Sequence, residues 1–150
     1  MRVRRAVTAV VLAASCCGGL TACGSHHEGD EAVWELAGTD GLTQTSQVFT
    51  AIVTRVGCSG GMQGHPVKPV IEPGKASIVI TFRIAPHFSG AADCQGTPGV
   101  PYTVRLPEPL GDRTLVDGDC RSGTIDIGDC RAGGVRLRWR GGEPQIPGQR

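Results

Sequence analysis

The chain has 150 residues, which allows one domain at most, and its 15 Lys and Arg nearly balance its 14 Asp and Glu. This balance predicts neither a nucleic-acid partner nor a strong electrostatic attraction to a membrane surface. Aromatic residues make up only 4% of the chain, so a core has to be built mainly from Val, Ile, Leu and Ala.

The first residues have the pattern of an export signal. Met1–Arg5 carries three arginines, Ala6–Ala14 is apolar, and Leu20-Thr21-Ala22-Cys23 follows. The apolar run is too short for a good membrane-spanning helix. The ending L-T-A-C resembles the lipobox of bacterial lipoprotein precursors. The resemblance implies that residues 1–22 are cleaved, that Cys23 is lipid-modified, and that the protein is anchored to the cell membrane on its extracytoplasmic face. An ordinary secretory signal, with Cys23 incidental, is the alternative.

Residues 23–31 contain no apolar residue between the cysteine and the body, which is typical of a flexible tether. His26 and His27 lie near Glu28 and Asp30, and such a group can be considered as a metal site. An unstructured segment does not hold ligands in place, so we interpret it as a solvated linker.

Period-two alternation of apolar residues predicts β-strands throughout residues 32–140. The central one is Ala76–Ala85, where Ile78, Ile80, Phe82 and Ile84 share one face. Further strands are expected at Ala32–Ala37, Gln47–Val56, Pro66–Ile71, Tyr102–Leu106, Thr114–Val116 and in a last strand where Val135, Leu137 and Trp139 alternate with arginines. No segment after residue 23 has a helical repeat.

Several details of these strands and loops can be anticipated. Trp34 is expected as a lid beside the buried Val33 and Leu36, and the Gln47–Val56 strand is expected to be apolar on both faces. Glu72-Pro73-Gly74-Lys75 has the composition of a type II turn, which would fold Pro66–Ile71 antiparallel onto the central strand. Residues 86–101 are expected to form a long crossover loop, and residues 141–150 a disordered tail.

Four cysteines remain after the signal segment, and an even number in an exported chain predicts two disulfides. Sequence alone allows three pairings. We expect Cys58–Cys94, because Cys58 ends one predicted strand and Cys94 lies in the loop that leaves the central strand, which brings both to the same end of the sandwich. We expect Cys120–Cys130, because G-D-C-R occurs at Gly118–Arg121 and again at Gly128–Arg131, and a tight turn between the two repeats would bring their ends together.

Candidate catalytic residues centre on Ser59. Gly57-Cys58-Ser59-Gly60-Gly61 resembles the G-x-S-G-G around the nucleophile of chymotrypsin-like serine proteases, but Cys58 replaces the usual aspartate. His65 and His87, the candidate bases, follow the serine instead of preceding it. A glycine-rich turn is therefore the preferred interpretation.

Candidate ligand-binding residues are of two kinds. Asp117, Asp119, Asp126 and Asp129 cluster around the second cysteine pair, but their spacing does not match a calcium loop, and neither loop histidine has a second ligand nearby for zinc. Arg136, Arg138 and Arg140 form a stripe that could bind phosphate groups or an acidic polymer, or serve as the solvent face of an edge strand.

Together these patterns predict an all-β protein, a small antiparallel β-sandwich with two disulfides, for which an immunoglobulin-like arrangement is one option. We expect a membrane-anchored binding or interaction module for a protein or small-molecule ligand, with no cofactor, no metal and no nucleic acid. The alternatives are a small hydrolase using Ser59 or a loop histidine, and an inhibitor that presents residues 86–101. The body is similar to small lipoproteins that have no assigned activity, so this resemblance implies none.

Overall fold

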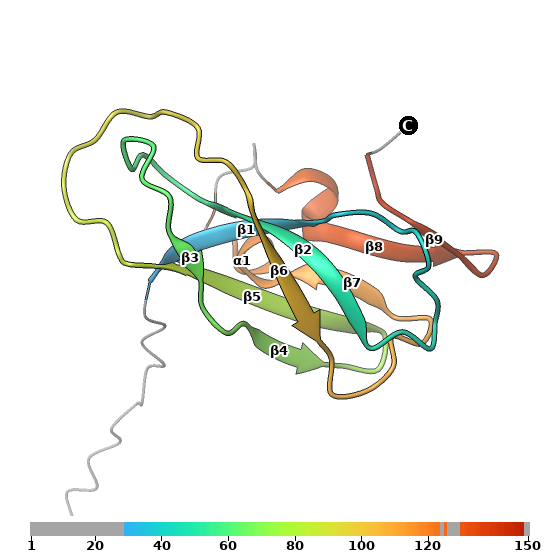
Figure 1. Cartoon of the computed structure of the whole chain (residues 1–150). Coiled ribbons are helices and arrows are strands. Elements are labelled where there is room, and N and C mark those ends of the chain that lie inside the picture. Colours follow the sequence, from blue (N-terminus) through green and yellow to red (C-terminus); the bar gives the residue numbers. More distant parts are fainter. Residues whose placement is uncertain (1–28, 124, 126–129, 149–150) are drawn as a thin grey trace, which may run out of the picture.

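The computed structural model describes residues 29–123, 125 and 130–148, which form strands joined by loops and two short helical turns (Figure 1). The signal segment, Cys23, His26 and His27 lie outside the described residues. In chain order the elements are β1 (Asp30–Leu36), β2 (Val48–Arg55), β3 (His65–Pro66), β4 (Val70–Pro73), β5 (Ser77–Ala85), β6 (Val100–Arg105), β7 (Thr114–Asp117), α1 (Gly118–Ser122), the 3-10 turn η1 (Arg131–Gly134), β8 (Val135–Arg140) and β9 (Glu143–Gln145).

Strand β5 is the element that joins the two halves of the fold. The strand order is β6-β2-β1-β5-β7-β8-β9, with β3 and β4 also paired to β5. The first half of β5 pairs with β4 and β7, and its last residues pair with β1 and β3. The hydrophobic side chains of β1 and β2 meet those of β5, β7 and β8 in one core. The predicted all-β class is therefore confirmed.

The expectation of a purely antiparallel sheet is wrong at one pair, because β5 and β7 run parallel. A parallel pair needs a crossover connection, and the chain between these strands passes through the long loop and β6 before it returns. The resulting sheet is mixed, which departs from the two antiparallel sheets of an immunoglobulin domain.

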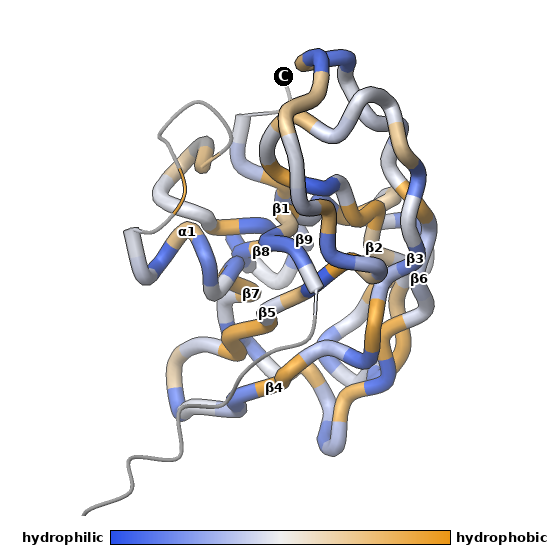
Figure 2. The backbone as a smooth tube through the Cα atoms, turned by 90° about the vertical axis from the view of Figure 1, so that its left-hand side faces the viewer, coloured by the Kyte–Doolittle hydropathy of each residue, from blue (hydrophilic) through white to orange (hydrophobic). Residues whose placement is uncertain are grey.

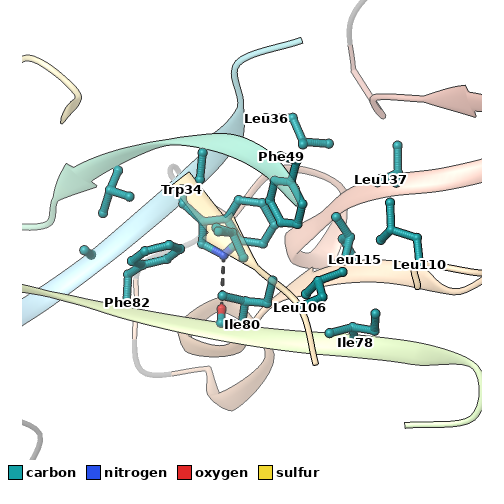
Figure 3. Packing of buried hydrophobic residues seen from close by; sticks show 14 of the residues in the cluster. Trp34, Leu36, Phe49, Ile78, Ile80, Phe82, Leu106, Leu110, Leu115 and Leu137 are labelled. Atoms are coloured by element: carbon teal, nitrogen blue, oxygen red, sulfur yellow. Dashed lines mark hydrogen bonds between the residues drawn. The ribbon is translucent and has the colours of Figure 1, made fainter. Parts of the chain in front are cut away.

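The core confirms the alternation predicted for the central strand. Ile78, Ile80, Phe82 and Ile84 are each at most 1% exposed, and hydrophobic segments of β2 and β5 are visible in Figure 2. Trp34 is no lid: it is fully buried, and its indole N–H donates to the Ile80 carbonyl at 3.0 Å (Figure 3). Strand β1 lies between β2 and β5, and Trp34 is on its buried face together with Ala32 and Leu36. The ring centroid of Trp34 lies 6.0 Å from that of Phe49.

Two local expectations for the strands need correction. Strand β2 is buried on one face only, that of Phe49, Ala51, Val53 and Arg55. The β4–β5 hairpin forms as expected, but its tip lies two residues later than predicted. Pro73 stays paired with Ile78, and the Gly74 N–H donates to the Ser77 carbonyl at 2.8 Å.

The C-terminal segment also differs from the expectation, since residues 141–148 are ordered. Strand β9 pairs antiparallel with β8, and Ile146 packs against the core. The turn between them is Gly141-Gly142, with φ of 60° and 85°. Positive φ at both central residues is what a two-residue hairpin of this kind requires, and Gly-Gly supplies it without strain. Residues 149 and 150 lie outside the described part.

Both predicted disulfides are present. Cys58–Cys94 ties the loop after β2 to the loop after β5, and Cys120–Cys130 ties α1 to the segment before η1. The short helix α1 was not expected. It begins at an N-cap, where the Asp117 side chain accepts from the Asp119 N–H, and five residues are too few for a hydrophobic repeat.

Candidate functional site

A buried carboxylate fixes the part of the fold that carries the candidate site. Asp117 ends β7, caps α1 and is 0% exposed. Its Oδ1 accepts a hydrogen bond from the backbone N–H of Asp119 at 3.1 Å. Its Oδ2 accepts from the backbone N–H of Trp34 at 3.1 Å and from Arg136 Nη2 at 2.9 Å. One side chain thereby links β1, β7, α1 and β8.

The charge of this carboxylate depends on those donors. Burial raises the pKa of Asp117, while the hydrogen bond and charge of Arg136 and the N–H groups of Trp34 and Asp119 oppose that rise. A buried charge that loses its partner is costly, because neither water nor another ion replaces it. Arg136 is therefore a structural residue, and its Nη2 also donates to Cys120 Sγ at 3.5 Å.

The burial of Arg136 corrects the predicted stripe of three arginines. Arg136 is 5% exposed, because α1 with its disulfide lies over the start of β8, whereas Arg138 and Arg140 extend past this cover and are exposed. Gly134 allows the close approach. It has φ +77°, and a Cβ there would come within 2.5 Å of the Cys120 Cβ.

Arg138 and Arg140 line a cleft of about 590 Å³ beside the β8–β9 hairpin. The residues that line it are Thr39, Arg138, Arg140, Gln145, Ile146, Pro147 and Gly148. The strand register places Arg138 opposite Gln145 and Arg140 opposite Glu143. The arginines thus stand on a paired strand, and Ile146 next to them is anchored in the core.

The two cleft arginines differ from most of the others in the described chain. Arg55, Arg83, Arg113 and Arg136 each form an ion pair with a carboxylate. Arg138 and Arg140 form none with a residue that the structure describes, so their guanidinium groups remain available to a ligand. Each guanidinium offers a planar fork of N–H donors that matches a carboxylate or a phosphate.

Sequence reasoning missed most of this cleft. It singled out Arg138 and Arg140 but not Thr39, Gln145 or Ile146, since the tail was expected to be disordered. A signal was present: Gly141-Gly142 directly follows an alternating strand, which is a pattern typical of a tight hairpin.

The residues considered for catalysis are not brought together. Ser59 is 2% exposed, and its Oγ lies 3.3 Å from the Thr97 hydroxyl. No described histidine hydrogen-bonds to it. His65 is exposed in β3, and the ring of His87 pairs with Asp30.

The residues considered for metals are engaged elsewhere or lie outside the described part. Asp117 pairs with Arg136, and Asp119 pairs with Arg83. Asp126 and Asp129 are outside the described residues. Within residues 29–123, 125 and 130–148, no group of three His, Cys, Asp or Glu side chains could hold a metal ion.

Comparison of the chain with protein-family models, curated proteins and solved structures gives no match. In the part of the chain that the structure covers, no helix has the length and apolar character needed to cross a membrane. The geometry of the cleft is therefore the main guide to function.

The contrast between Arg136 and Arg138 can be tested directly. We expect Arg136→Met to lower the free energy of unfolding by about 3–5 kcal/mol, because it leaves Asp117 as a buried charge without its ion partner. Arg138→Met, on the same strand but exposed, is the matched control and should change the free energy by no more than about 0.5 kcal/mol. Urea denaturation of both variants measures the difference, and equal effects would contradict a structural role for Arg136.

Proposed function

We propose that this protein is a lipid-anchored extracytoplasmic module that binds a negatively charged ligand in the β8–β9 cleft. The observation that carries the proposal is the pair of exposed arginines, Arg138 and Arg140, which share one cleft and have no described carboxylate partner. Isolated surface arginines are common in proteins. Two guanidinium groups on one strand, neither with a described carboxylate partner, favour a ligand with carboxylate or phosphate groups.

The rest of the cleft suits a ligand with more than a bare charge. Gln145 and Thr39 add side chains that can donate and accept hydrogen bonds, and Ile146 with Pro147 adds an apolar wall. The volume, about 590 Å³, lies in the range of small-molecule sites. A short acidic segment of a polymer or peptide would also fit this chemistry.

The sequence and the disulfides support the proposed location on the extracytoplasmic face of the membrane. The lipobox-like Leu20-Thr21-Ala22-Cys23 supports anchoring at Cys23, and two disulfides in a chain of this size are typical of exported proteins. The hydrolase alternative draws no support from the buried Ser59. The inhibitor alternative keeps its basis, because Cys58–Cys94 and the contacts of the first loop residues with Asp30 hold that loop in place.

Anion binding can be measured by calorimetric titration of the mature protein, held in a neutral detergent, with pyrophosphate and with succinate. We expect saturable binding to at least one of them, which the double variant Arg138→Met/Arg140→Met weakens at least about tenfold, since charge-assisted hydrogen bonds contribute roughly 1.5–3 kcal/mol each.

The control is Arg105→Met on edge strand β6, where the arginine is also exposed but lies outside the cleft. It should leave the affinity unchanged. Binding that falls equally in both variants, or that is absent for both anions, would refute the cleft as an anion site.

Anchoring is tested at Cys23. Replacement Cys23→Ala should move the protein from the membrane fraction to the soluble extracytoplasmic fraction, because it removes the thiol that would carry the lipid. Intact-mass measurement of the wild-type protein should show a diacylglyceryl group on Cys23 as the first residue. A mature terminus downstream of Cys23, without lipid, would contradict the proposal.

A further inference from the structure

The start of β1 is fastened to the loop that follows β5. The Asp30 carboxylate pairs with the Arg55 guanidinium and the His87 ring, and it accepts the Phe88 N–H at 2.9 Å. Arg55, whose side chain is 1% exposed, also donates to the Pro86 carbonyl at 3.1 Å. The point where the described body begins is therefore held against residues 86–88.

Two loops lie together at this end of the molecule. Cys58–Cys94 joins residues 57–64 to residues 86–99, and the Gly60 N–H donates to the Asp93 carbonyl at 3.0 Å. Figure 1 shows both loops at the upper left, on the side where β1 begins, while the β8–β9 hairpin lies on the opposite side. We call residues 57–64 and 86–99 the disulfide-linked loops.

These loops are unusual in composition. Asp93 is their only Asp, Glu, Lys or Arg, although such residues make up 19% of the whole chain. Met62 lies among them and is 43% exposed. The connections at the other end of the strands carry many more charges, including Asp40, Glu108, Asp112 and Arg113.

The length of chain between Cys23 and Asp30 limits how the body can sit. Seven residues span at most about 25 Å even when fully extended. A lipid on Cys23 would thus keep Asp30, and the disulfide-linked loops fastened to it, close to the bilayer. The other end of β1, which leads to Thr39 in the cleft, lies six residue steps beyond Asp30, or about 20 Å further along the strand.

We infer that the disulfide-linked loops form a bilayer-contacting surface, with Met62 at the lipid interface, so that the arginine cleft faces away from the membrane. This inference rests on the lipid anchor of the proposed function. Loops with a single charged residue, Asp93, can approach the headgroups with little repulsion and with little cost of stripping water from ions. An exposed methionine there gains apolar contact with the acyl boundary.

The experiment places a tryptophan at one of two exposed apolar positions in the full lipidated protein. Met62→Trp reports on the loops, and Val48→Trp is the matched control, because Val48 is 45% exposed and lies at the end of β2 remote from Arg55. Each variant is reconstituted in vesicles of phosphatidylcholine and phosphatidylglycerol, with and without bromine near the headgroup end of the acyl chains. The emission of Trp34 and Trp139, measured in the parent protein, is subtracted.

We expect brominated lipid to quench the added emission of Met62→Trp by about half or more, since interfacial side chains lie within roughly 5–10 Å of the acyl boundary. The emission of Val48→Trp should be unaffected. Quenching of neither variant, of both equally, or of Val48→Trp alone overturns the inference.

Intact-mass measurement on the same samples distinguishes a missing lipid anchor from a missing bilayer contact. A lipidated Cys23 without quenching of Met62→Trp refutes the bilayer-contacting surface and leaves the anchor intact. A Cys23 without lipid refutes the anchor and this inference together, while the anion titration still decides the cleft.

Discussion

A single buried carboxylate, Asp117, is the constraint on which the C-terminal half of the structure depends. Two backbone N–H groups and the Arg136 guanidinium donate to it. Asp117 ends β7 and caps α1, and its donors belong to α1, β1 and β8. Losing the Arg136 guanidinium would leave this buried carboxylate without its ion partner. The carboxylate therefore stabilises the packing of β1, α1 and β8 around the end of β7, next to the parallel β5–β7 pair.

The buried ion pair and the exposed site lie on neighbouring parts of β8. Arg136 lies where the β7–β8 register shifts, and its guanidinium reaches Asp117 and Cys120. Beyond this point β8 pairs with β9, and Arg138 and Arg140 border a cleft instead of a core. Stability and binding are thus assigned to neighbouring residues of identical type, and what separates them is the element packed above each one.

Features that depend on local pattern could be predicted from the sequence, and features that depend on which strands meet could not. Alternation found the buried face of β5, the positions of strand ends found Cys58–Cys94, and the short spacing of the two G-D-C-R repeats found Cys120–Cys130. The burial of Arg136 could not be predicted, because it follows from α1, which is too short to leave a periodic signal. The β8–β9 hairpin could have been found, since Gly141-Gly142 marks its turn, and with it half of the cleft.

A double-mutant cycle between Asp117 and Arg136 measures most directly whether this buried pair holds the C-terminal half together. The free energies of unfolding of Asp117→Asn, Arg136→Met and the double variant are compared with that of the parent protein. If the pair holds β7, α1 and β8 together, the double variant should be less destabilised than the sum of the single variants by about 1.5–3 kcal/mol. Effects that add within about 0.5 kcal/mol would show that the two side chains act independently, and would contradict a joint structural role for Asp117 and Arg136.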